Sequence, residues 1–82
     1  MDIASQVGPA LRALRGEIGI SQEALADRAG LDRTYVSGIE RGRRNPSVRS
    51  LQKVSDALGV TLDVIFIRAR ELAEGKGSRK RC

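Results

Sequence analysis

The sequence predicts an all-α domain built from five short helices. Apolar residues recur three or four positions apart in successive segments, the spacing that places them on one face of a helix. Residues that favour helix ends bracket these segments. The starts are Ser21, Asp32 and Ser47, and the ends are Gly19, Gly30 and Gly59. With 82 residues, one Tyr, one Phe and no Trp, the chain forms one small domain with an aliphatic core, which is marginal enough to favour a dimer.

The first helix begins just before Pro9, a residue that the first turn of a helix tolerates. It carries Leu11, Leu14 and Ile18 on one face and ends at Gly19. We expect that face to be buried.

The second and third helices follow closely. Ser21 caps a helix over residues 22–29, and Gly30 ends it in a left-handed conformation. Asp32 then caps a helix over residues 33–41. A helix, a short turn containing glycine and a second helix form the helix-turn-helix unit.

The third helix has two different faces. One face carries the apolar residues Tyr35, Val36 and Ile39 and is expected to point inward. The opposite face carries Arg33, Thr34, Ser37, Gly38 and Arg41. Short polar groups and guanidinium groups without a carboxylate suit a negatively charged groove that is rich in hydrogen-bond acceptors.

Gly38 lies inside this helix, where glycine costs about 1 kcal/mol relative to alanine. A close approach is expected to compensate for that cost. The approaching group is either a nucleic acid or a neighbouring helix packed tightly against Gly38.

Residues 42–46 form a loop, because Gly42 and Pro46 both disfavour helix. Arg43, Arg44 and Asn45 in this loop can reach a phosphate backbone, and the alternative is a solvated basic loop. Ser47 then caps the fourth helix, which Gly59 closes. Its expected buried stripe is Val48, Leu51, Val54 and Leu58.

Thr61 is expected to cap the fifth segment, which is apolar at more positions than one face needs. Its β-branched residues also suit a short strand, but the strong helix formers at residues 68–74 favour helix. We expect Leu62, Ile65 and Phe66 to close the core. The apolar residues left over predict a two-fold dimer interface. They are Val64, Ile67 and Leu72.

The folded domain is expected over residues 1–74, followed by a disordered basic tail at residues 75–82. The net charge is +5, but four positive charges lie in the tail, which leaves +1 over residues 1–74. Cys82 is the single cysteine, so no disulfide framework forms, and a reduced thiol is expected.

The composition argues against an enzyme. The chain has no His, its one Cys is in the tail, and it lacks a Gly-rich phosphate loop and paired metal-ligand spacing. We therefore expect no metal, no cofactor and no small-molecule ligand. No apolar run approaches the 18 or so residues of a membrane span and no signal-peptide pattern follows Met1, so a cytoplasmic protein is expected.

Several motifs in register resemble the phage-repressor-like (XRE-type) family of helix-turn-helix transcriptional regulators. They are Ser21-Gln22-Glu23-Ala24-Leu25-Ala26, Gly30 and Val36-Ser37-Gly38-Ile39-Glu40-Arg41-Gly42. The likeness runs from about Leu11 to Phe66, and residues 31–41 with Asn45-Pro46-Ser47 are most similar to restriction-modification controller proteins. The family also has a short helix where the fifth segment lies, which supports a five-helix fold.

The resemblance implies a sequence-specific regulator that binds double-stranded DNA as a homodimer on a pseudo-palindromic operator. Arg33 is expected to read guanine, Thr34 and Tyr35 to contact thymine methyl groups or phosphates, and Ser37 to contact a nearby base or the backbone. Gln22, Arg41, Arg43, Arg44 and Asn45 are expected to contact phosphates. The resemblance also implies an ion pair between Arg15 and Glu40. The alternatives are a phage-type repressor, an antitoxin-type autorepressor or a protein-interaction adaptor.

Overall fold

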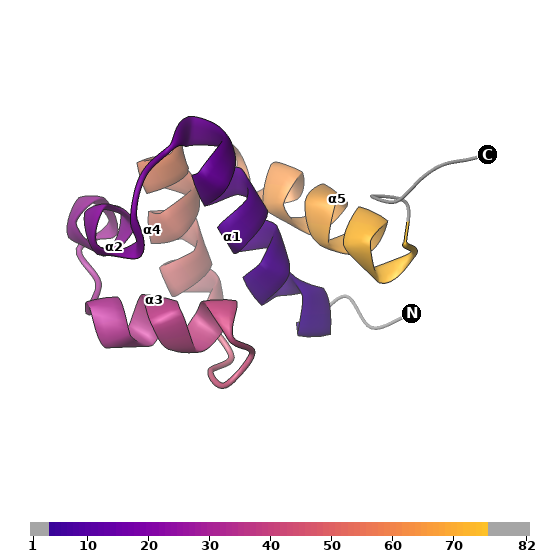
Figure 1. Cartoon of the computed structure of the whole chain (residues 1–82), viewed down its shortest axis with the longest axis horizontal. Coiled ribbons are helices and arrows are strands. Elements are labelled where there is room, and N and C mark those ends of the chain that lie inside the picture. The colour runs from indigo at the N-terminus through magenta and orange to yellow at the C-terminus, as the bar shows by residue number, and fades with distance from the viewer. Residues whose placement is uncertain (1–3, 76–82) are drawn as a thin grey trace.

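In the computed structural model, which describes residues 4–75, five α-helices and a preceding 3₁₀ turn make up the fold (Figure 1). In chain order they are η1 (Ala4–Gln6), α1 (Val7–Ile18), α2 (Gln22–Ala29), α3 (Arg33–Glu40), α4 (Val48–Leu58) and α5 (Leu62–Ala73). This part of the chain contains no strand, so the all-α prediction is confirmed and the strand alternative for the fifth segment is wrong. Apart from Gly75, the predicted basic tail with Cys82 lies outside the described residues.

Ser21, Asp32 and Ser47 cap their helices as predicted, whereas Thr61 makes no side-chain capping hydrogen bond at the start of α5, so that prediction is wrong. The Ser21 hydroxyl accepts a hydrogen bond from the backbone N–H of Ala24 (3.0 Å), and the Asp32 carboxylate accepts one from Thr34 (3.2 Å). Gly30 ends α2 in the left-handed conformation (φ 69°), which glycine adopts without a steric penalty. The helix-turn-helix unit is therefore defined by local interactions at both ends of its turn.

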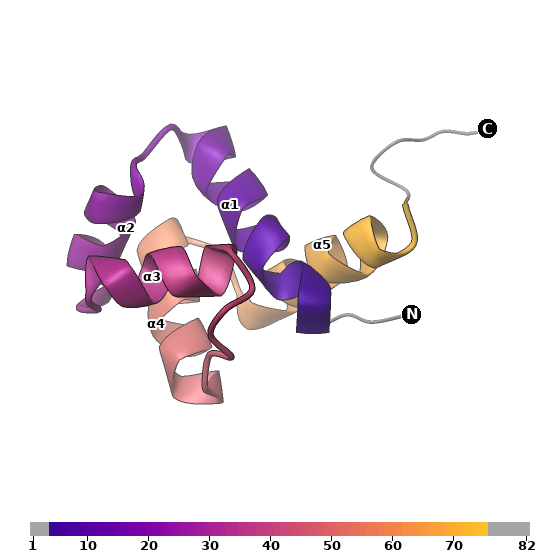
Figure 2. The same ribbon diagram turned by 60° about the horizontal axis from the view of Figure 1, so that its bottom comes forward.

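The core lies where α1 crosses the group formed by α2, α3 and α4, with α5 packed against α1 on the other side (Figures 1 and 2). The side chains that are almost completely buried come from all five helices, and no tryptophan or phenylalanine is among them. They include Leu11, Leu25, Val36, Ile39, Val54 and Ile65. The core is aliphatic, as the composition indicates.

Three residues that the helical spacing assigned to the core are exposed instead: Ile18 (46%), Val48 (72%) and Phe66 (40%). Ile18 is the last residue of α1 and Val48 is the first residue of α4, so both lie at helix ends. Figure 2 shows the start of α4 projecting beyond α3. Phe66 follows the fully buried Ile65 and is rotated by about 100° away from it on the same helix.

The outer side of α5 is partly apolar. Ile67 is 52% exposed, whereas Val64 and Leu72 are half-buried and pack against the core. Arg68 lies between these positions and donates a hydrogen bond from Nη1 to the Glu17 carboxylate on α1 (2.6 Å). This hydrogen bond lowers the pKa of Glu17 below its ordinary value and links α5 to α1.

The start of α1 crosses the end of α3 at backbone distance. A Cβ atom at Gly8 would overlap the carbonyl oxygen of Ile39 and lie 2.8 Å from that of Glu40. Only glycine allows this approach, because the two contacted atoms belong to the backbone of α3. The crossing therefore fixes the end of α3 relative to the rest of the domain.

Candidate nucleic-acid interface

The outer face of α3 is polar and basic, as the sequence predicts. Arg33, Thr34 and Arg41 are exposed, and Ser37 and Gly38 are half-buried between them. The inner face carries the fully buried Val36 and Ile39, which hold the helix against the core. This packing fixes which side of α3 faces outward.

The loop after α3 folds back against the same face. The backbone N–H groups of Arg43 and Arg44 both donate to the carbonyl oxygen of Gly38, at 2.8 Å and 3.1 Å. Arg43, Arg44 and Asn45 are all exposed. The loop thus adds two guanidinium groups and an amide to the basic side of α3.

A shallow hollow joins the helix face to the loop. Its lining consists of Thr34, Ser37, Gly38, Arg41, Arg43 and Arg44. The described residues that line this hollow provide three guanidinium groups and two hydroxyl groups, and none of them has a carboxylate. Such a lining has donors for the oxygen atoms of a nucleic acid and no acidic group to repel them.

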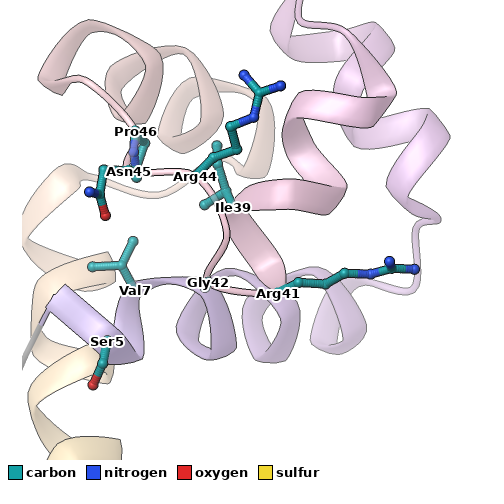
Figure 3. A pocket seen from close by; sticks show the side chains of 9 residues that line it. Ser5, Val7, Ile39, Arg41, Gly42, Arg44, Asn45 and Pro46 are labelled. Atoms are coloured by element: carbon teal, nitrogen blue, oxygen red, sulfur yellow. The ribbon is translucent and has the colours of Figure 1, made fainter.

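A second hollow lies between the start of α1 and the loop (Figure 3). It is lined by Ser5, Val7, Gly8, Ile39, Arg41, Gly42, Arg44, Asn45 and Pro46. In Figure 3 the side chains of Val7 and Asn45 face each other across it, whereas the guanidinium groups of Arg41 and Arg44 extend away from it. This hollow shares Arg41 and Arg44 with the basic face, but their guanidinium groups lie outside it.

Tyr35 lies at the edge of α3 and is half-buried. Its hydroxyl donates to the Ser50 hydroxyl on α4 (3.2 Å), which also accepts from the Ser47 hydroxyl (3.0 Å). The Arg44 guanidinium lies over the Tyr35 ring, 5.9 Å from its centroid. A phosphate oxygen can only accept a hydrogen bond. To donate to a phosphate, the Tyr35 hydroxyl must therefore turn its proton away from the Ser50 hydroxyl.

A buried carboxylate network lies behind the interface. The Glu40 side chain is 2% exposed and accepts two hydrogen bonds from Arg15, one from Nε (2.8 Å) and one from Nη2 (3.0 Å). These bonds raise the pKa of Arg15 above its ordinary value. A third guanidinium nitrogen of Arg15 donates to the carbonyl oxygen of Ile20 (2.9 Å). The pair implied by the family resemblance is thus present, and it links α1 to the end of α3.

The sequence predicts a phosphate contact for Gln22, but in the structure its side chain forms a hydrogen bond within the protein. Its side-chain amide donates to Oε1 of Glu40 (2.9 Å), so it completes the buried network from the start of α2. An amide nitrogen has two hydrogen atoms, and the second remains for an external acceptor. Gln22 therefore connects the interface to the core.

Sequence reasoning missed two features of this site. The Ser50 hydroxyl that holds Tyr35 was not considered, although Ser47 and Ser50 have the spacing of a cap and its partner. The approach of Gly8 to α3 joins residues about 30 positions apart, and helical periodicity carries no signal for such a contact.

Within residues 4–75 no group of three or more His, Cys, Asp or Glu residues is placed to hold a metal ion. No helix in that range is long and apolar enough to cross a membrane.

The chain is similar to known helix-turn-helix proteins over most of its length. The helix-turn-helix family HTH_3 matches residues 11–65. Control protein C.MunI of Mycoplasma sp is 47% identical over 66 residues, which cover 79% of this chain and 89% of that protein. The crystal structure of the restriction-modification controller protein C.AhdI from Aeromonas hydrophila is 44% identical, with a TM-score of 0.74 over 76% of this chain and 94% of that one. The clp gene regulator ClgR from Corynebacterium glutamicum is 28% identical, with a TM-score of 0.86 over 95% of this chain and 83% of that one.

Proposed function

Because this chain belongs to the helix-turn-helix family of DNA-binding transcriptional regulators, we propose that it acts as a sequence-specific homodimer on a pseudo-palindromic operator. The observation that carries the proposal is the basic outer face of α3 together with the loop folded onto it. In a helix-turn-helix protein the second helix of the unit enters the major groove, and here that helix is α3.

The roles of the side chains follow from their places on this face. Arg33, at the N-terminal end of α3, reads guanine O6 and N7, and Thr34 and Ser37 contact neighbouring bases or the backbone. Tyr35 contacts a thymine methyl group with its ring edge. The phosphate contacts come from residues around this face. They are Gln22, Arg41, Arg43, Arg44 and Asn45.

The dimer forms through α5. Ile67 and Phe66 leave apolar surface exposed on this helix, and Val64 and Leu72 lie at its half-buried margins. Two copies related by a two-fold axis cover this surface and place two α3 helices in successive major grooves. The half-sites of the operator then lie about one helical turn, roughly 34 Å, apart.

We further propose that the chain is the controller protein of a restriction-modification system and acts in the cytoplasm. The controller proteins C.MunI and C.AhdI support this, because their identities of 47% and 44% extend over three quarters or more of the chain. The second candidate is a regulator of genes outside a restriction-modification system. The structural match to ClgR favours it, because that match covers 95% of this chain. Methyltransferase and endonuclease genes beside this one decide for the controller, and their absence decides for the second candidate.

The basic face also argues against a protein-interaction adaptor. Adaptor surfaces present aromatic or leucine anchors, whereas the outer face of α3 presents Arg33, Thr34 and Arg41. Tyr35, the one aromatic residue of this helix, is half-buried and bonded to Ser50.

The test is a fluorescence-anisotropy titration of a labelled duplex from immediately upstream of the gene, across a salt series, with a random duplex of equal length as the control. We expect a preference of about a thousandfold or more for the upstream duplex and two protomers per site. Equal affinity for both duplexes at every salt concentration would show that the charged face gives only non-specific binding.

A further inference from the structure

Gly38 lies in the middle of α3 and faces the loop. A Cβ atom built on Gly38 would lie 2.6 Å from Cγ of Arg44, 3.5 Å from its Cβ and 3.7 Å from its Cδ. The first of these distances is too short for two carbon atoms, so no other residue fits here while Arg44 keeps its place. The three nearest atoms all belong to Arg44, so within the protein the close approach at Gly38 comes from the loop after α3 and not from a neighbouring helix.

The backbone of the loop is fixed on the same residue. The carbonyl oxygen of Gly38 accepts from the N–H groups of both Arg43 and Arg44, so the start of the Arg44 side chain has little freedom to shift. Farther out, the guanidinium group lies over the Tyr35 ring, and the Tyr35 hydroxyl is held by Ser50. Arg44 is thus held at its stem by Gly38 and near its end by Tyr35.

We propose that Gly38 is a positioning residue for Arg44, which sets the direction of its guanidinium group toward a phosphate at the edge of the groove. The inference rests on the proposed function, because that function assigns the phosphate contact to Arg44. Gly38 itself touches no DNA in this account. A glycine inside a helix makes the helix less stable than an alanine would. In return, the absence of a side chain at Gly38 leaves the space that Arg44 occupies.

A double-mutant cycle on the upstream duplex tests the coupling. Arg44→Ala is expected to weaken binding roughly three- to tenfold near physiological salt and to reduce the salt slope by about one. Gly38→Ala is expected to produce the same loss, and the double variant no further loss, because both changes remove one phosphate contact. Binding by Gly38→Ala at the wild-type level, or losses that multiply in the double variant, would overturn the proposal.

Gly16→Ala is the matched control. Gly16 also lies inside a helix, but nothing lies within 4 Å of the position that its Cβ would take. This variant is expected to bind DNA as the wild type does. A loss equal to that of Gly38→Ala would show that any alanine in place of a helical glycine has the effect.

Thermal melting separates the proposal from a general folding defect. The added methyl group overlaps only the Arg44 side chain beyond its Cβ, so Gly38→Ala is expected to fit without strain once Arg44 is alanine. The double variant should then melt at or above the temperature of Arg44→Ala alone. A large additional drop in the double variant would contradict the proposed contact.

A measurement on the free protein keeps this inference separate from the proposed function. In nuclear Overhauser spectra, contacts between the Arg44 side chain and the Tyr35 ring are expected in the wild type and in Gly16→Ala, and absent in Gly38→Ala. If they persist in Gly38→Ala, the positioning role is wrong. If they vanish while the wild type shows no preference for the upstream duplex, Gly38 positions Arg44 and the proposed operator function fails.

Discussion

Arg33 and Arg43 have the same charge but different neighbours. Arg33 is the first residue of α3, whereas Arg43 lies in the loop that follows α3 in the chain. We expect Arg33→Ala to cost on the order of 1 to 3 kcal/mol on the cognate site and to relax specificity at one base pair. Arg43→Ala should weaken binding to all DNA similarly and lower the salt slope by about one.

Affinities for the cognate duplex, single-base variants of it and a random duplex measure this difference. Each variant serves as the charge-matched control for the other. Equal effects of the two changes on cognate and random DNA would show that Arg33 does not read a base.

The Arg15–Glu40 pair is nearly buried, and its loss is expected to be costly. Arg15→Met leaves the Glu40 carboxylate, 2% exposed, with Gln22 as its remaining partner, and we expect a loss of about 3 kcal/mol in the free energy of unfolding. The exposed Arg12 on the same helix provides the control, and Arg12→Met should cost about 0.5 kcal/mol or less. Urea denaturation measures both, and similar losses would mean that the pair adds no stability.

At the scale of single residues, the sequence predicts which side chains face outward better than it predicts their partners. The polar side of α3 follows from helical spacing alone, because its apolar residues must face the core. The pairing of Arg15 with Glu40 joins residues 25 positions apart and was reached through resemblance. The contacts of Gln22 with Glu40 and of Tyr35 with Ser50 depend on how the helices cross, which spacing does not encode.

At the scale of helices, the crossing of α1 over α3 depends on Gly8. We expect Gly8→Ala to lower the free energy of unfolding by about 1 to 3 kcal/mol, because the methyl group would meet backbone carbonyl oxygens of α3 that cannot rotate away. Gly16→Ala in the same helix meets nothing and should be neutral or stabilising by up to about 1 kcal/mol. Thermal melting of the two variants distinguishes the effects, and equal melting temperatures would contradict the close approach.

The starts of α2, α3 and α4 were predictable because capping is local. Ser21, Asp32 and Ser47 each accept a backbone N–H within three residues, so the sequence contains the whole signal. Burial along the helices was less predictable. Ile18 and Val48 have the spacing of core residues yet are exposed at helix ends. Spacing indicates the direction in which a side chain points, but it does not indicate whether a neighbouring helix is long enough to cover that side chain.

At the scale of the whole molecule, α5 is expected to hold two copies together. Ile67→Glu places a charge on the exposed apolar surface of α5 and should yield monomers at concentrations where the wild type is dimeric. Val48→Glu is the control, because Val48 is still more exposed but lies at the start of α4. Sedimentation velocity measures the state of each variant, and a fully dimeric Ile67→Glu protein would rule out this interface.

The all-α fold with its helix-turn-helix unit was predictable from the sequence, because its caps and apolar stripes are local. The composition of the exposed apolar surface on α5 was less predictable. Phe66 was assigned to the core but is exposed beside Ile67, whereas Val64 and Leu72 pack partly against the core. Which leftover apolar residues remain exposed depends on the angle at which α5 packs against α1.

A hydroxyl-radical footprint of the protein on the DNA upstream of its gene tests most directly whether it binds as a symmetric, sequence-specific dimer. We expect two protected blocks, related by two-fold symmetry and about one helical turn apart, and we expect Ile67→Glu to weaken both together. A single protected block, or protection spread evenly along the duplex, would contradict a symmetric, sequence-specific dimer.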